Sequence, residues 1–277
     1  MPKNIVLCSD GTGNSALKGR GTNVFKVYEA IDLNGHKFDE GLQKQVAFYD
    51  DGVGTENFKP LKLLGGAFGW GLSRNVKELY TALAKCYEAG DHIYLFGFSR
   101  GAFTVRQLAG FIIGCGIIDK KKWKTDAELK RLVRKAFWKY RKRYHTWLGD
   151  LLKKYLPSPK KARHEFRQSY SFKDETHAPQ GKVRLRFIGV WDTVAAVGLP
   201  FDELANFINR VIYCFKFPDR RLNYRVDKAC HALAIDDERH SFLPEIWDEE
   251  TETRDNRIEQ VWFSGAHSNV GGGYPKQ

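Results

Sequence analysis

The chain has 277 residues, a length at which α/β folds routinely form one domain, and 42% of them are hydrophobic, enough for a sizeable core. Its formal net charge is +12, and its five cysteines lack any C-x-x-C pair, which argues against a disulfide framework or a metal centre and for reduced thiols in a protein made in the cytoplasm. The first apolar run, residues 5–8, is too short for a signal peptide, and the longest, residues 108–118, is too short to cross a bilayer.

Hydrophobic periodicity predicts strands and helices in alternation. Strands are expected over residues 4–8 and 45–49, with a helix around residues 24–31 between them. A helix at about residues 75–88 precedes the next strand. Such alternation favours an α/β fold, hydrolase-like, with a mostly parallel sheet and helices on both of its faces.

The first strand runs into Asp10-Gly11-Thr12, a sequence with two interpretations. The same sequence follows the first strand of phosphatases that form an aspartyl phosphate. Those enzymes need a second aspartate two positions earlier as the nucleophile, and this chain has Cys8 there. In a hydrolase the same loop supplies a backbone N–H to the oxyanion hole, and Gly11 or Thr12 is the expected donor. A turn in which the Asp10 carboxylate accepts hydrogen bonds from its own loop is the structural alternative.

The segment 91–102 is the most informative, because an apolar strand leads through Gly-Phe-Ser-Arg-Gly into a helix. This is the pattern of a nucleophile elbow, in which the serine, here Ser99, stands on a tight turn at the carboxyl edge of a sheet. Gly97 and Gly101 are the small residues that such a turn requires. The N–H of Arg100, at the amino end of the helix, is the expected first donor to the oxyanion.

A serine nucleophile needs an orienting acid and a histidine base, which in this architecture follow it along the chain, each after a strand. Residues 182–190 form the next expected strand, and Asp192 after it stands where the orienting carboxylate belongs; a capping aspartate is the alternative. Residues 258–263 form a later strand, and the loop after it carries His267. The predicted catalytic residues are therefore Ser99, Asp192 and His267.

Three of the eight histidines, His231, His240 and His267, are serious candidates for the base. The first two fall in a helical pattern around residues 229–242, where a packed or solvated histidine is more common than a catalytic one. This leaves His267 as the predicted base.

Seven short segments, in this order, are far more specific than a single elbow. They are residues 7–14 (LCSDGTGN), 22–25 (TNVF), 49–55 (YDDGVGT), 97–102 (GFSRGA), 189–194 (GVWDTV), 231–236 (HALAID) and 263–274 (FSGAHSNVGGGY). Together they resemble an α/β-hydrolase family that includes the catalytic domain of antibacterial phospholipase effectors delivered by type VI secretion systems. The resemblance covers nearly the whole chain except about residues 120–179. It implies hydrolysis of acyl esters, phospholipids in the studied members, with Ser99, Asp192 and His267 at the triad positions; we expect no cofactor.

Residues 120–179 differ from the rest as a basic helical insertion. Residues 120–167 carry eighteen Lys or Arg against four acidic residues, a net charge of +14, so everything else sums to about −2. Apolar side chains recur there at three- and four-residue steps, which predicts an amphipathic helix. They are Leu129, Leu132, Val133, Ala136, Phe137, Tyr140, Tyr144, Trp147, Leu148 and Leu151. Pro157 and Pro159 are expected to end the helical region, and residues 169–181 to form a polar loop.

Hydrolases of this fold commonly place a lid or cap at this point of the chain. A basic face beside aromatic side chains suits docking on anionic lipid. The alternative is a cap helix that packs its apolar face on the hydrolase body and leaves its basic face in solvent. The residues expected at the membrane or lid surface are Lys130, Arg131, Arg134, Lys135, Phe137, Trp138 and Trp147.

Three functions stay open at this point. The first is a serine hydrolase that cleaves acyl esters of membrane lipids through an acyl-enzyme. The second is a soluble esterase or thioesterase on small acyl substrates, and the third a non-enzymatic membrane- or nucleic-acid-binding protein on a hydrolase scaffold. Specific nucleic-acid binding is not expected, because no helix-turn-helix, RRM or zinc pattern is present. The resemblance adds expected partners, a secretion system and an immunity protein, and export from the cytoplasm by type VI secretion.

We expect residues 1–277 to form a single catalytic domain that continues further in the natural chain. The sequence stops ten residues after His267, whereas the histidine loop of this fold should lead into a helix that covers the last strand. Without that helix, apolar surface on residues 258–263 is expected to be uncovered.

Overall fold

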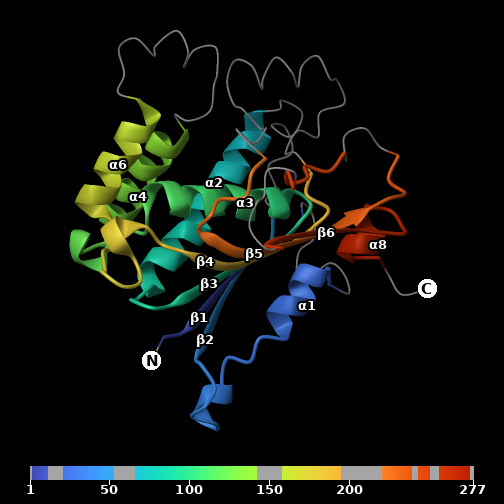
Figure 1. Ribbon diagram of the computed structural model, residues 1–277, viewed down its shortest axis with the longest axis horizontal. Helices are drawn as coiled ribbons and strands as arrows, with labels where there is room; N and C mark the ends of the chain where they lie inside the picture. The colour runs from blue at the N-terminus through green and yellow to red at the C-terminus, as the bar shows by residue number, and fades with distance from the viewer. Residues whose placement is uncertain are drawn as a thin grey trace.

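The computed structural model describes residues 2–11, 21–52, 66–141, 158–194, 220–238, 243–249 and 256–274. Its strands form one sheet in the order β2-β1-β3-β4-β5-β6, and every pairing between neighbours is parallel (Figure 1). The strands are β1 (Asn4–Ser9), β2 (Gln45–Asp50), β3 (His92–Phe98), β4 (Leu185–Trp191), β5 (Val226–Ala234) and β6 (Ile258–Phe263). The parallel α/β sheet that the sequence predicts is thus confirmed.

Helices cover both faces of this sheet, as expected (Figure 1). One face carries α1 (Asn23–Glu29). The other face carries α2 (Gly66–Cys86) and α3 (Arg100–Cys115), and α4 (Asp126–Arg141) and α6 (Pro159–Tyr170) pack against these helices. The short helix α8 (His267–Gly271) contacts β5, and single 3-10 turns lie at η1 (Gly35–Lys37), η3 (Lys120–Lys122) and η5 (Pro179–Gly181).

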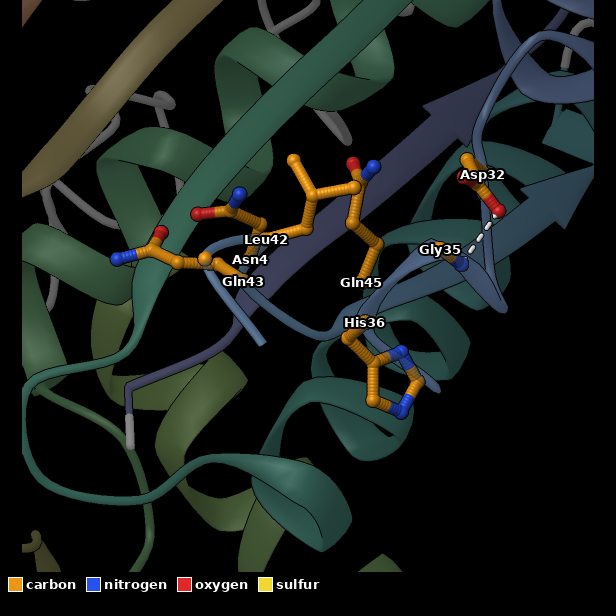
Figure 2. Close-up of a pocket in the computed structure, with 8 residues that line it drawn as sticks. Asn4, Asp32, Gly35, His36, Leu42, Gln43 and Gln45 are labelled. Atoms are coloured by element: carbon orange, nitrogen blue, oxygen red, sulfur yellow. Dashed lines mark hydrogen bonds between the residues drawn. The ribbon is translucent and has the colours of Figure 1, made fainter. Parts of the chain in front are cut away.

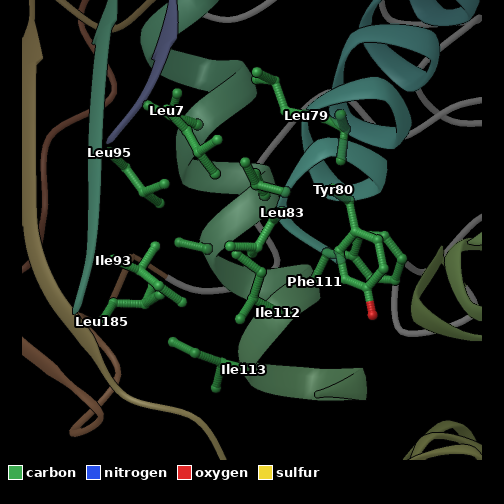
Figure 3. Close-up of a cluster of buried hydrophobic side chains, with 14 of the residues drawn as sticks. Leu7, Leu79, Tyr80, Leu83, Ile93, Leu95, Phe111, Ile112, Ile113 and Leu185 are labelled. Carbon is green, nitrogen blue, oxygen red and sulfur yellow. The ribbon is translucent and has the colours of Figure 1, made fainter. Parts of the chain in front are cut away.

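The two faces of β1 show how the sheet is fixed between these layers. Leu7 belongs to the large hydrophobic core that β1 forms with α2 and α3 (Figure 3). In this core the rings of Tyr80 and Phe111 stack with their centroids 4.2 Å apart. Cys8, next to Leu7 in the strand, points to the opposite face and packs with Val24 of α1. Because successive side chains of a strand alternate between faces, a strand buried on both sides is apolar throughout. The carboxyl ends of the strands are therefore held rigidly side by side.

The helix predicted around residues 229–242 is wrong, because Val226–Ala234 is strand β5. It lies inside the sheet, between β4 and β6, and its side chains on both faces are buried or half-buried. A short apolar run of this kind lacks the alternation of a half-buried strand and cannot be told from a buried helix by periodicity. His231 is consequently a strand residue, and His240 lies outside the described residues.

Two helices begin at points that the sequence interpretation missed. Pro159 does not end the helical region but is the first residue of α6, whose N-cap Ser158 accepts a hydrogen bond from the Lys161 N–H at 3.3 Å. Proline suits this position, because the first N–H of a helix has no partner within the helix. The helix expected from about residue 75 begins at Gly66, so α2 includes part of the glycine-rich stretch before it.

The amphipathic stripe predicted in the basic insertion packs on the body of the domain. Leu129, Val133 and Phe137 of α4 are buried in the same core as α2 and α3, and the Phe137 ring lies 5.4 Å from that of Phe111. The prediction that Phe137 faces a membrane is therefore wrong, because its ring fills the space between α4 and α3. Trp138, by contrast, is 58% exposed.

The opposite face of α4 presents the charges that the sequence predicts at a surface. Lys130, Arg131, Arg134 and Lys135 are all exposed. Trp147 lies outside the described residues. None of the helices in the described ranges is both long and apolar enough to span a membrane.

The last strand, β6, stands at the edge of the sheet. Its Val261, Trp262 and Phe263 are between 42% and 51% exposed. Apolar surface on this strand is therefore open. That the natural chain supplies a closing helix stays a prediction.

Candidate active site

Ser99 stands on the turn between β3 and α3, in the backbone geometry of an elbow. Its φ and ψ are 57° and −124°, a conformation that non-glycine residues rarely adopt. A Cβ on Gly101 would lie 2.1 Å from the Ser9 carbonyl oxygen, and one on Gly97 would lie 2.7 Å from the Ala102 nitrogen. Only glycine fits at either position. The tight turn at Ser99 therefore explains why the motif has glycine two residues before and two residues after the serine.

The structure brings the three predicted catalytic side chains into one chain of hydrogen bonds. Ser99 Oγ lies 2.8 Å from His267 Nε2, and His267 Nδ1 lies 2.5 Å from Asp192 Oδ2. The side chains come from the end of β3, the end of β4 and the start of α8, at the carboxyl edge of the sheet. All three are buried, with Ser99 6% exposed. An Nδ1–H that donates to the carboxylate leaves the Nε2 lone pair facing the serine hydroxyl, which is the arrangement for removing its proton.

Asp192 is held at a fixed angle by its own backbone and by β5. Its φ is 38°, and its N–H donates to the Ala232 carbonyl at 2.8 Å. Its Oδ1 accepts the Ala234 N–H at 3.1 Å, so that Oδ2 is the oxygen directed at His267. The carboxylate is thus oriented as well as buried, which a simple capping aspartate does not require.

His231 lies at this site in a role that the sequence analysis, which considered it only as a candidate base, did not predict. Its Nε2 accepts the Thr193 N–H at 3.0 Å, directly after Asp192 on the chain, and its Nδ1 lies 3.4 Å from Gln260 Oε1. Burial, and to a lesser degree Arg106, lowers the pKa of His231 to about 3. The ring is therefore neutral at neutral pH and keeps the Nε2 lone pair that accepts this bond. Only a strand assignment for β5, which pairs His231 with Val190 of β4, could have revealed this contact.

The loop after β1 corrects one expected oxyanion donor. The Gly11 N–H donates to Asp10 Oδ1 at 2.6 Å and is therefore not directed at an oxyanion in this structure. The Asp10 carboxylate also accepts hydrogen bonds from the hydroxyls of Thr22 and Tyr49, at 2.5 and 2.6 Å. Burial raises the pKa of Asp10, although these hydrogen bonds act to lower it. Asp10 thus binds its own loop, as the structural alternative predicted. Thr12 lies outside the described residues.

Arg100 begins α3, so its N–H belongs to the first turn of that helix, beside Ser99. The amides of a first helical turn carry partial positive charge and suit an anion. Its role as an oxyanion donor stays a prediction.

A pocket of about 260 Å³ lies elsewhere, at the opposite edge of the sheet (Figure 2). Asn4 and Gln45, the first residues of β1 and β2, line it together with Asp32, whose Oδ1 accepts the Gly35 N–H at 2.7 Å. Because the triad side chains gather at the carboxyl edge, this pocket is separate from them. Within the described residues no cluster of three or more His, Cys, Asp or Glu could hold a metal ion.

The family model described as "T6SS, Phospholipase effector Tle1-like, catalytic domain" matches residues 3–277. The chain belongs to this family. The Tle1-like family is one of ester-hydrolase catalytic domains, so the resemblance drawn from the seven sequence segments is confirmed.

Other proteins similar to this Tle1-like domain are longer than it. "Uncharacterized protein YEL023C" of Saccharomyces cerevisiae is 30% identical over 242 residues, which are 80% of this chain and 32% of that protein. An uncharacterized protein from Pseudomonas aeruginosa of known structure aligns with a TM-score of 0.52 and 18% identity, over 99% of this chain and 42% of that one. A lipase/esterase from Lactobacillus plantarum aligns at a TM-score of 0.39 and 12% identity, over 96% and 79%. The chain therefore spans less than half the length of the first two relatives, and the Pseudomonas structure supports the fold alone.

Proposed function

We propose that this domain hydrolyses carboxylic esters through an acyl-enzyme on Ser99, with phospholipids as its substrates. The observation that carries the proposal is the hydrogen-bonded series from Ser99 Oγ through His267 to Asp192. A serine next to a neutral, carboxylate-oriented imidazole is the arrangement that activates a hydroxyl as a nucleophile.

In the first half-reaction, Ser99 Oγ attacks the ester carbonyl while His267 Nε2 takes the hydroxyl proton. The tetrahedral intermediate carries its negative charge on the former carbonyl oxygen, and the Arg100 N–H at the start of α3 is the proposed donor to it. His267 then gives the proton to the leaving alkoxide, the C–O bond to the alcohol breaks, and the acyl group stays on Ser99. Asp192 keeps its charge throughout and stabilises the imidazolium.

In the second half-reaction, water takes the place of the alcohol. His267 removes a proton from water, the hydroxide attacks the acyl-enzyme carbonyl, and the proton returns to Ser99 Oγ as the carboxylic acid leaves. The net reaction is ester plus water to acid plus alcohol. No cofactor enters the balance.

His231→Ala is expected to lower kcat by about 10- to 100-fold with little change in KM, because the Asp192 turn loses its anchor while no substrate contact is removed. The unpaired, buried Thr193 N–H should also cost about 1–3 kcal/mol of unfolding free energy. His231→Gln offers an amide oxygen as acceptor and should recover part of both losses. The measurements are steady-state kinetics on a soluble short-chain ester and urea denaturation. A folded His231→Ala with an unchanged kcat would contradict this positioning role.

The phospholipid part of the proposal draws support from the family description and from the exposed face of α4. Arg131 and Lys135 carry positive charge there beside the 58% exposed Trp138. Each basic residue near an anionic bilayer contributes about 1 kcal/mol to binding. An aromatic side chain beside such charges suits the interface between headgroups and acyl chains.

Arg131→Gln with Lys135→Gln is expected to weaken binding to anionic vesicles by about 2 kcal/mol, roughly thirtyfold, and to slow lipid hydrolysis accordingly. Turnover of a soluble short-chain ester should be unchanged, and added salt should weaken wild-type binding in the same way. Lys37→Gln with Lys44→Gln removes the same charge from exposed positions near the amino edge of the sheet and is the matched control. Vesicle sedimentation and fatty-acid release measure the two effects. Equal loss on both substrates would indicate that this face only supports the fold.

The experiment that tests the proposed function is a substrate panel with wild type and Ser99→Ala. It comprises a short-chain p-nitrophenyl ester, phosphatidylcholine vesicles and phosphatidylglycerol vesicles, with labelling of Ser99 by a fluorophosphonate. Turnover of the soluble ester without fatty-acid release from either vesicle would make the domain a soluble esterase. Absence of both labelling and turnover would leave a non-enzymatic protein.

Delivery by a type VI secretion system, opposed by an immunity protein, is a separate proposal. It is supported by the family description alone. A similar sequence is also found in a yeast protein described only as uncharacterized. The presence of this catalytic domain alone therefore does not make a protein a secreted effector. A gene for an immunity protein next to this one, whose product inhibits hydrolysis, would support it.

A further inference from the structure

A pocket of about 570 Å³ lies between α2 and α4, beside Phe48 of β2. We call it the α2–α4 pocket. Among its eleven lining residues are five Lys or Arg and one acidic residue, Glu78. Its volume is within the range of small-ligand sites.

Two of these five cations form ion pairs with neighbouring carboxylates, and three form none with any residue that the structure describes. Arg74 pairs with Glu78 at 2.8 Å, and Lys85 pairs with Asp126 at 2.7 Å. Within the described ranges of the chain, the remaining cations form no ion pair. They are Lys77, Lys130 and Arg134.

Lys77 shows the electrostatic consequence most clearly. Its side chain is half-buried, and its pKa is lowered by that burial and by the positive charge of Arg134, which the nearby carboxylate of Glu78 offsets only in part. Its ammonium lies 5.7 Å from the centroid of the Phe137 ring, which offers weak compensation. Positive charges that repel one another at a partly desolvated position are stabilised when an anion binds between them.

The base of the α2–α4 pocket is apolar. Val133 of α4 is 1% exposed, and Phe48 and Ala82 are half-buried. Cationic and apolar linings therefore meet in one cavity. The 260 Å³ pocket of Figure 2 differs in this respect, because none of its lining residues is a lysine or an arginine.

None of the three triad residues lines the α2–α4 pocket. Phe48 lies on β2, one edge strand of the sheet, whereas Asp192 and His267 follow β4 and β6 toward the other edge. A ligand in this pocket therefore need not enter the site proposed for ester hydrolysis.

We propose that the α2–α4 pocket binds an anionic amphiphile, with a phosphate head held by Lys77, Lys130 and Arg134 and the adjoining methylenes packed on Phe48 and Val133. Phosphate oxygens accept charge-assisted hydrogen bonds from both guanidinium and ammonium groups. Inorganic phosphate shares the chemistry of the head, but the apolar base favours a ligand with a chain. This assignment is independent of the proposed hydrolysis.

The test uses monooctyl phosphate as the probe, because it contains no carboxylic ester that the domain could cleave. Isothermal titration calorimetry compares it with octyl phosphocholine and inorganic phosphate, each below any micelle concentration. Monooctyl phosphate is expected to bind at least about tenfold more tightly than either, since only it offers both a net negative head and a chain. Lys77→Gln with Arg134→Gln should weaken that binding by about tenfold or more.

Two further variants separate this site from general attraction to a basic protein. Lys37→Gln with Lys44→Gln removes the same charge from exposed positions outside the pocket and should leave binding unchanged. Ala82→Leu fills the base without changing charge and should weaken monooctyl phosphate but not inorganic phosphate. Equal losses in the two double variants, equal affinity for octyl phosphate and inorganic phosphate, or an unaffected Ala82→Leu would each overturn the proposal. Thermal melting confirms that each variant is folded.

Discussion

Ser99→Ala is expected to lower kcat for ester hydrolysis by on the order of 10⁴ to 10⁶, because the proposed acyl-enzyme cannot form without the hydroxyl. His267 and Asp192 then have no nucleophile to activate, so their presence adds little to the residual rate. Fluorophosphonate labelling should disappear together with turnover. The measurement is steady-state release of p-nitrophenol at saturating substrate.

The fold should survive this substitution. The elbow is held by its backbone, in which the Ser99 N–H donates to the Trp191 carbonyl at 3.0 Å and the Phe103 N–H donates to the Ser99 carbonyl at 3.2 Å. Alanine keeps both bonds and has the same Cβ at the positive φ, so the unfolding free energy should change by less than about 1 kcal/mol. Ser169→Ala, at an exposed position of α6, is the control and should keep full activity. Retained activity in folded Ser99→Ala would remove the proposed mechanism entirely.

The sequence predicted the sheet well where a strand is bounded by turn or loop residues. The strand expected at residues 258–263 is β6 with the same bounds, and that expected at residues 4–8 is β1 with one residue added. It failed at β5, because residues 229–234 form a short run without a regular alternation of apolar and polar side chains, which fits a buried helix as well as a strand. It also failed at Pro159, since the same residue that stops one helix is well suited to begin another.

The candidate site divides in the same way. Ser99, Asp192 and His267 could be found from chain order, because each follows a strand and parallel strands deliver their carboxyl ends to one edge. The Gly11 N–H could not be assigned, because the direction of a single loop amide depends on whether the adjacent Asp10 carboxylate captures it. The sequence analysis considered His231 only as a base and missed its bond from the Thr193 N–H, because that bond depends on the register between β4 and β5, which no local pattern encodes.

Phe137 marks a further limit of sequence analysis. A helix with an apolar stripe and a basic face fits a membrane or a protein core equally well, and only the presence of α2 and α3 decides that the stripe is buried. What the sequence did predict was the charge on the other face. These basic residues lie on two different surfaces of α4. Lys130 and Arg134 line the α2–α4 pocket, whereas Arg131 and Lys135 lie outside it.

His267→Ala is expected to reduce kcat about as much as Ser99→Ala, and Asp192→Asn by less, on the order of 10⁴. The ranking follows from the bonds that each side chain makes. His267 is the only one of the three that contacts both others, so its removal leaves the Ser99 hydroxyl without a base. The asparagine of the second variant keeps the shape and an oxygen for the Ala234 N–H, but it offers a neutral amide to the imidazole in place of a carboxylate.

The matched control for the histidine is His177→Ala, since His177 is exposed and bonds Asp174 at 2.9 Å. It lies beside Gly90, just before the amino end of β3, whereas the triad side chains gather at the carboxyl edge of the sheet. This variant should keep wild-type kinetics. The decisive comparison is between His267→Ala and His231→Ala, because His231 pairs with Val190 near the same carboxyl edge of the sheet. If His231→Ala abolished turnover with a native spectrum while His267→Ala retained it, the base would be His231. Its neutral ring and its bond from the Thr193 N–H argue against that outcome, because a base occupied by a backbone amide cannot accept the serine proton.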